Sequence, residues 1–333
     1  MDRHDALRFH GWEPHQRYRG GFNDRRQRSA LWRHHRGRNR CLPRRLRDRL
    51  LFDSAGIHRG TWTESVLYMF AGGSDGAYPM ASLAISTGGV LYGTTSAGAG
   101  TCFPYPGCGT VFSLAPPASP GGAWTESVLH SFTLPSTPCT QEPCDGGSDG
   151  AYPTVSVAIG SGNVLYGTTA AGGSGPCDWG CGTAFQLTPP ASPGGDWTET
   201  VIYSFINPNG IFSSNAGASG LAIGSGGVLY GTLVLPGPML DNPNPCGIVF
   251  SLTPPASPGS AWTETALHTL PNDGSSGCGP NEGVVISNNG VLYGVTQSGS
   301  YNPLNAQAPP EVFSLTPQRL LAVPGPMQCY ICS

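Results

Sequence analysis

Eight cysteines lie between residues 102 and 278, and their spacing suggests disulfide chemistry. Six of them form three pairs that lie close together in the sequence, and Cys246 and Cys278 are the two that remain. Glycine and polar residues surround all eight, so buried free thiols fit poorly. Zinc is a weaker interpretation, because these loops contain no CxxC and no His. We predict four disulfides, which persist in an oxidising compartment. The close pairs are Cys102 with Cys108, Cys139 with Cys144 and Cys177 with Cys181.

A second set of residues combines aromatic rings with acids in the same kind of loop. Such combinations are typical of sites that recognise carbohydrate or peptide. The alternative is that the rings only anchor long loops, and the sequence leaves both interpretations open. The candidate binding residues are Phe103, Tyr105, Asp178, Trp179, Phe212, Asp241 and Tyr301.

Histidines and glutamates outside these loops are weaker candidates for chemistry. His130 and His268 stand where other copies of a repeated segment have Tyr68 and Tyr203, which favours a packing role. The glutamate of every "WTE" motif is interpreted as structural for the same reason. These glutamates are Glu64, Glu126, Glu199 and Glu264.

Two remaining motifs also fail to indicate an enzyme. Asp75 and Asp149 occur in "GGSDGAYP", where Asp-Gly is a turn signal, and calcium binding would need more clustered oxygens. "SPGGAWT" weakly resembles the Asp-box turn of sialidases but lacks its Asp. No nucleophile elbow, P-loop or metal triad is recognisable. We predict no catalytic residue, no metal site and no cofactor.

Four copies of one unit follow residue 61 and must position these loops. "WTESVLYMF" and "VFSL", each with variants, and "VLYG" recur in order with a period of 62 to 74 residues. In the second copy, "TVSVAIG", "VLYGTT", "GTAFQL" and "WTETVIYSF" are β-branched or aromatic and are bounded by turn residues, which indicates four strands. No segment has a helical period long enough to compete.

Four antiparallel strands per repeat predict an all-β fold, a β-propeller of four four-stranded blades. Two geometries remain open. The favoured one closes the ring by pairing the strand at Trp62 with the strand at Val312, and the other is an open arc of a larger propeller. The predicted blades span about 79–132, 153–205, 217–270, and 283–316 with 62–70.

The connections between these strands divide into two faces. Turns such as "STGG" and "PPASPGG" are short and uniform on one face, whereas the loops on the other face vary in length and content. All eight cysteines of the repeat region and all candidate binding residues fall on the variable face. Variation confined to one face marks where repeat proteins usually bind their ligands.

"LYGTT", "GTVFSL", "VLHSF" and "DGAYP", in this order, resemble the GloVer tandem-repeat proteins over residues 61–317. The resemblance implies a bacterial, exported and often surface-attached protein of the "choice-of-anchor" type, with no established activity. This chain departs from that pattern at both ends, because neither an export signal nor an anchor is recognisable.

Residues 1–60 contain 16 of the 17 basic residues, all Arg, which would ordinarily suggest a nucleic-acid-binding arm. However, reading residues 44–60 one base later permits "GGCGTVFSLTPPASTGG", close to the in-frame "PGCGTVFSLAPPASPGG" at 106–122. A two-base shift over residues 317–332 permits "PASPGGAWTDAVLYMF". We therefore interpret residues 1–60 and 318–333 as disordered, out-of-frame translation, with no nucleic-acid partner.

The sequence therefore predicts a non-enzymatic repeat domain over residues 61–317. We expect an exported or cell-surface monomer that binds carbohydrate or protein on its Cys-rich loop face. No run of 18 apolar residues occurs, so we predict no membrane span. The alternative is a secreted propeller enzyme, a lyase or hydrolase acting on polysaccharide.

Overall fold

The computed structural model describes only part of the chain. The protein divides into two units, residues 1–63 and 64–333, and every described residue belongs to the second unit. The predictions made for residues 1–60 and 318–333 lie outside the described residues. The described ranges are 64–100, 102, 107–134, 147–174, 177, 179–192, 194–206, 218–235, 246–257, 259–271, 277–299 and 309–317.

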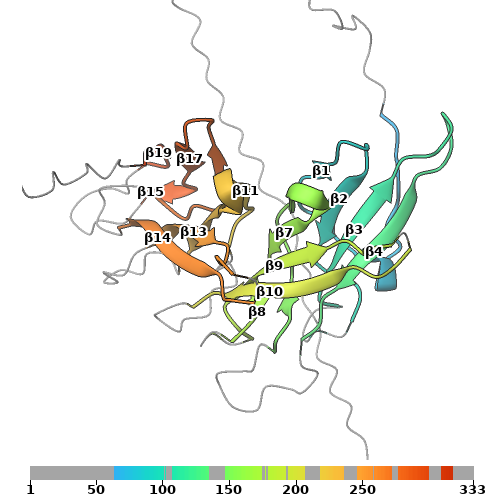
Figure 1. Ribbon diagram of the computed structural model, residues 1–333, viewed down its shortest axis with the longest axis horizontal. Coiled ribbons are helices and arrows are strands. Elements are labelled where there is room, and N and C mark those ends of the chain that lie inside the picture. Colours follow the sequence, from blue (N-terminus) through green and yellow to red (C-terminus); the bar gives the residue numbers. More distant parts are fainter. Residues whose placement is uncertain are drawn as a thin grey trace, which may run out of the picture. The chain divides into compact units, whose positions relative to one another are not determined.

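Four antiparallel sheets follow one another along the chain, one for each predicted repeat, and we name them blades 1 to 4 (Figure 1). Blade 1 consists of β1 (Ala84–Ile85), β2 (Leu91–Thr95), β3 (Thr110–Ala115) and β4 (Thr125–Ser131). Blade 2 consists of β6 (Ala158–Ile159), β7 (Leu165–Thr168), β9 (Thr183–Thr188) and β10 (Thr198–Ser204).

The remaining two blades repeat the same motifs. Blade 3 consists of β11 (Ala222–Ile223), β12 (Leu229–Val234), β13 (Gly247–Thr253) and β14 (Thr263–Leu270). Blade 4 has three strands among the described residues, β16 (Val284–Ile286), β17 (Leu292–Val295) and β19 (Val312–Leu315). Three 3-10 turns are also described, η1 (Gly73–Asp75), η2 (Ser161–Asn163) and η3 (Ser225–Gly227).

The protein is all-β, and its four small sheets have the arrangement of a four-bladed β-propeller, as the repeats predicted. Within each blade the strands pair antiparallel in chain order. The uniform turns predicted from "GSGN" and "GSGG" are the 3-10 turns η2 and η3, which join the first two strands of blades 2 and 3.

The favoured pairing of the first strand with the last is wrong for the described residues. β19 pairs only with β17, and residues 64–70 form no strand. Phe70 instead packs edge-on against Phe112 of β3, with ring centroids 4.9 Å apart. The Phe70 ring is therefore partly buried against blade 1, although residues 64–70 do not pair as a strand. The edge-on contact recurs between successive blades, in Phe132 with Phe185 and Phe205 with Phe250.

The "VLYG" and "VFSL" motifs recur together because they pack on each other. Gly93 of β2 lies opposite Phe112 of β3, and the Phe ring occupies the space that a side chain at Gly93 would need. The same pair occurs in every blade, as Gly167 with Phe185, Gly231 with Phe250 and Gly294 with Phe313. The missing side chain of each Gly thus makes room for a Phe ring, which is fully buried in blades 1 to 3 and partly buried in blade 4.

A hydroxyl in the second strand of blades 1 to 3 links each blade to the next repeat. In each case Oγ1 of a threonine donates a hydrogen bond to a backbone carbonyl some fifty to sixty residues later. Val295 stands at this position in blade 4. The linked pairs are Thr94 with Val155, Thr168 with Ala218 and Thr232 with Pro280.

The described residues include no helix with the length and apolar character needed to cross a membrane.

Candidate functional site

Disulfides staple the variable loops, as their spacing predicted. Cys102 is bonded to Cys108 in the loop between β2 and β3, and Cys177 to Cys181 in the equivalent loop of blade 2. Cys246 is bonded to Cys278, which joins the start of β13 to the loop that follows β14. All six of these cysteines are at most 6 % exposed. The predicted pair Cys139 and Cys144 lies outside the described residues.

Small ladders of backbone hydrogen bonds hold the same loops. β5 (Gly150–Ala151) pairs with β8 (Ala171–Gly172), and β15 (Gly277–Cys278) pairs with β18 (Ser298–Gly299). A single bridge between Ala77 and Ala97 occupies the corresponding place in the first repeat, and in the third repeat Ala218 is bridged to Leu233 of β12. Sequence reasoning missed these ladders and interpreted "DGAYP" as a turn alone. The available signal was that "DGAYP" occurs twice, each time at the same distance before "VLYG".

Trp179 is the one candidate binding residue within the described part of the chain. It is partly buried and packs against the apolar core that includes Phe132, Phe185 and Cys108. Its carbonyl accepts a hydrogen bond from the Gly172 amide over 2.6 Å. This environment favours the loop-anchoring role for Trp179. The other candidates lie outside the described residues, namely Phe103, Tyr105, Asp178, Phe212, Asp241 and Tyr301.

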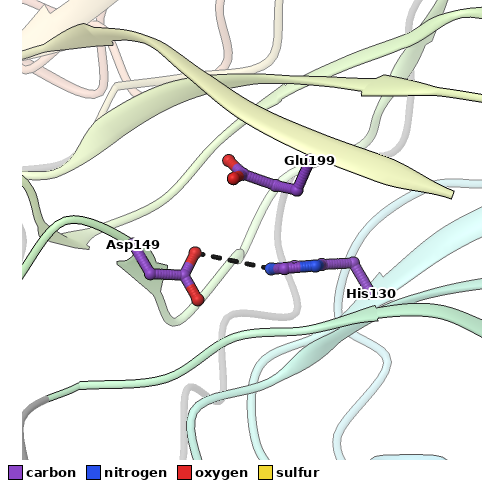
Figure 2. Close-up of side chains that lie close together, drawn as sticks. All are labelled: His130, Asp149 and Glu199. Carbon is purple, nitrogen blue, oxygen red and sulfur yellow. Dashed lines mark hydrogen bonds and ion pairs between the residues drawn. The ribbon is translucent and has the colours of Figure 1, made fainter.

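Three ionisable side chains from separate segments meet between blades 1 and 2 (Figure 2). His130 belongs to β4, Asp149 directly precedes β5, and Glu199 belongs to β10. One nitrogen or oxygen atom of each lies within 4.8 Å of the corresponding atoms of the other two. Nε2 of His130 lies 3.4 Å from Oδ1 of Asp149, and Figure 2 shows Glu199 beside this pair.

Backbone and hydroxyl donors fix the Asp149 carboxylate in this cluster. Oδ2 accepts hydrogen bonds from the Thr133 amide over 3.0 Å and from the Thr133 hydroxyl over 3.1 Å. Oδ1 accepts one from the Gly150 amide over 2.8 Å. The His130 ring is held by an edge-on contact with Phe132, with centroids 4.7 Å apart. His130 thus packs as the sequence predicted, but it also faces two carboxylates.

The two carboxyl groups of the cluster have opposite pKa shifts. Burial would raise the pKa of Asp149, but the hydrogen bonds from His130, Gly150 and Thr133 and the positive charge of His130 outweigh it and lower the pKa. Burial and the neighbouring charge of Asp149 raise the pKa of Glu199 to about 7, against the opposing effect of His130. Oε1 of Glu199 is buried and has no hydrogen-bond partner.

The preceding repeat contains the same arrangement with tyrosine in place of histidine. Tyr68 donates a hydrogen bond to Oδ2 of Asp75 over 3.1 Å, and the Ala71 amide donates to the same oxygen over 2.8 Å. Glu126 is the counterpart of Glu199, and its Oε1 is likewise buried without a hydrogen-bond partner. The arrangement is therefore a feature of the repeat, and the histidine is what distinguishes the cluster between blades 1 and 2.

Within the described ranges, His130, Asp149 and Glu199 are the one group of three His, Cys, Asp or Glu residues close enough to share a metal ion. Sequence reasoning did not find it, because 19 and 50 positions separate its members and each has a structural explanation within its own repeat.

Comparison with known proteins leaves the family unassigned. A scan against protein-family models gave no match, and a search of curated proteins found none with significant similarity. The resemblance to GloVer repeats therefore stays a prediction.

Proposed function

We propose that this protein is a non-enzymatic binding module that holds a carbohydrate or protein ligand on its disulfide-stapled loop face. The supporting observation is that covalent and backbone links hold the variable loops. Three disulfides and the short ladders β5–β8 and β15–β18 restrict loops whose sequences differ between repeats. Loops that are rigid before binding lose less conformational entropy when a ligand binds, which favours affinity.

An extracellular or cell-surface location is part of this proposal. Structural disulfides persist in oxidising compartments and are rare in the reducing cytosol. All six described cysteines are buried and disulfide-bonded, which is compatible with export. The motif resemblance to GloVer repeats, which are bacterial surface proteins, supports the same location.

The test is ligand binding by the full chain produced in an oxidising compartment. The oxidised protein should bind at least one ligand on glycan or extracellular-protein arrays, and reduction followed by alkylation should abolish binding. Tyr301→Ala should weaken binding, because Tyr301 lies in a variable loop. Ser192→Ala, in the uniform turn before β10, is the matched control and should bind normally. Unchanged binding after reduction would contradict the proposal.

A reducing-sugar and unsaturated-product assay on the glycans bound by the array separates binding from catalysis. The module should leave these glycans intact. Steady release of new chain ends by the oxidised protein would replace the binding module with the alternative, a polysaccharide lyase or hydrolase.

A further inference from the structure

We propose that His130, Asp149 and Glu199 form a binding site for one divalent transition-metal cation of the zinc type. The site would link β4 of blade 1, the segment before β5 and β10 of blade 2. It does not depend on a ligand at the loop face. It also revises our expectation of no metal site, which followed from the absence of a recognisable metal-binding motif in the sequence.

The spacing of the His130 and Asp149 atoms suits a shared cation. Zinc binds imidazole nitrogen and carboxylate oxygen at about 2.0 to 2.2 Å in tetrahedral geometry, which places two ligand atoms about 3.4 Å apart. Nε2 of His130 and Oδ1 of Asp149 are separated by 3.4 Å. A direct hydrogen bond between such groups is usually about 2.7 to 3.0 Å long. The pair is therefore wide for a hydrogen bond and well spaced for two ligands.

Glu199 supplies the third ligand at little cost. Its Oε1 is buried with no hydrogen-bond partner, so this oxygen gives up no hydrogen bond when it turns toward the pair. An atom of Glu199 already lies within 4.8 Å of both the His130 nitrogen and the Asp149 oxygen. A buried carboxylate oxygen without a partner is unfavourable, and a cation would remove that penalty.

The surroundings of Asp149 resemble the outer shell of a metal site. Ligating carboxylates are usually held by hydrogen bonds that fix their orientation. Thr133 donates two such bonds to Oδ2, and the Gly150 amide donates one to Oδ1. Phe132 packs edge-on against the His130 ring and orients it.

The ligand set selects the class of cation. Calcium and magnesium prefer oxygen ligands alone, whereas imidazole favours zinc and its neighbours in the first transition series. Three protein ligands also leave a fourth tetrahedral position for water. The neighbouring cluster of Tyr68, Asp75 and Glu126 lacks the imidazole, so it should not bind zinc with comparable affinity.

The experiment measures zinc bound by the oxidised, metal-free full chain, using equilibrium dialysis against zinc chloride. Because residues 1–60 contain six further histidines, total zinc alone does not identify the site. His130→Tyr is the informative variant, since Tyr68 already occupies this position in the preceding repeat. His268→Tyr is the matched control, since it removes an exposed histidine at the same position of blade 3.

Wild type and His268→Tyr should bind one equivalent of zinc more than His130→Tyr. Adding Tyr68→His to His130→Tyr should restore it, because the imidazole then faces Asp75 and Glu126. If His130→Tyr does not fold by circular dichroism, Glu199→Gln should weaken zinc binding at this site at least about ten-fold. Equal zinc binding by His130→Tyr and His268→Tyr, or by wild type and Glu199→Gln if the tyrosine variant is unfolded, overturns the proposal.

Discussion

Gly93 lies directly opposite Phe112 in the ladder between β2 and β3, and a β-carbon added to Gly93 would lie 2.6 Å from Cζ of the Phe ring. Real atoms do not approach so closely, so either the ring or the strand would have to shift. Because this pair recurs in all four blades, the requirement for glycine applies to every "VLYG" motif.

Gly93→Ala should therefore destabilise the protein by about 1 to 3 kcal/mol, the usual cost of overpacking a core. Gly88→Ala is the control, because its added carbon would meet no atom closer than 3.9 Å. Urea denaturation followed by circular dichroism measures both. A loss at Gly93 no larger than that at Gly88 would show that the ring moves aside freely.

The disulfides should differ in their contribution to stability. The bond between Cys246 and Cys278 closes a loop of 32 positions, whereas the bond between Cys177 and Cys181 closes one of four. By the loop-entropy relation, removing these bonds should cost about 4 and about 2 kcal/mol respectively. Double alanine variants of each pair, compared by thermal denaturation, provide the test. The reverse order would mean that contacts in the folded state outweigh loop entropy here.

The hydroxyl of Thr168 should stabilise the junction between blades 2 and 3. It donates to the carbonyls of Ala218 and Ser219 over 2.9 and 3.1 Å in a buried position. Thr168→Val keeps the shape but leaves both carbonyls without this donor, which should cost about 1 to 2 kcal/mol. The conversion Val295→Thr at the same position of blade 4 is the control and should change stability by less than about 0.5 kcal/mol. Equal effects on the denaturation midpoint would contradict this role.

Glu126 should make stability depend on pH. Burial raises the pKa of Glu126, and the charge of Asp75 raises it further. The folded state therefore holds this proton more tightly than the unfolded chain, so the contribution to stability is present at low pH. It is lost as the pH rises from the ordinary glutamate pKa toward the raised one.

Glu126→Gln removes this loss, so the variant should gain stability over wild type at about pH 8 and show no gain at about pH 4. The gain should stay below about 1 kcal/mol, because the side chain is only partly buried and water screens its charge. Glu64→Gln, at an exposed position of the same motif, should behave like wild type. A Glu126→Gln variant that is less stable than wild type at about pH 8 would refute the assignment.

Features confined to one repeat could be predicted from the sequence. β-Branched runs between turn residues predicted the blades, and the spacing of Cys177 and Cys181 predicted their bond. Contacts between repeats were harder. The position of Phe70 against Phe112 depends on which blade the segment packs on, and the sequence pattern is the same for either choice. Trp179 could not be assigned either, because a loop sequence does not show whether a ring points inward.

The cluster of His130, Asp149 and Glu199 was out of reach for a related reason. Each residue has an ordinary role within its own repeat, as a substitute for tyrosine, a turn residue and the recurring glutamate of "WTE". The stacking of blade 1 on blade 2 brings them together, and periodicity within one strand contains no information about that stacking.

The threonine bonds between blades have a consequence for how such a chain can change in length. The second and third repeats each carry a threonine donor directed at the following repeat and a carbonyl acceptor directed at the preceding one. A copy of a whole repeat would carry both, so a tandem duplication between two existing repeats would leave neither new junction short of a partner. Loss of a whole repeat would rejoin a donor with an acceptor in the same way. Unequal recombination within the gene could therefore add or remove blades in single steps, each step yielding junctions that are already complete.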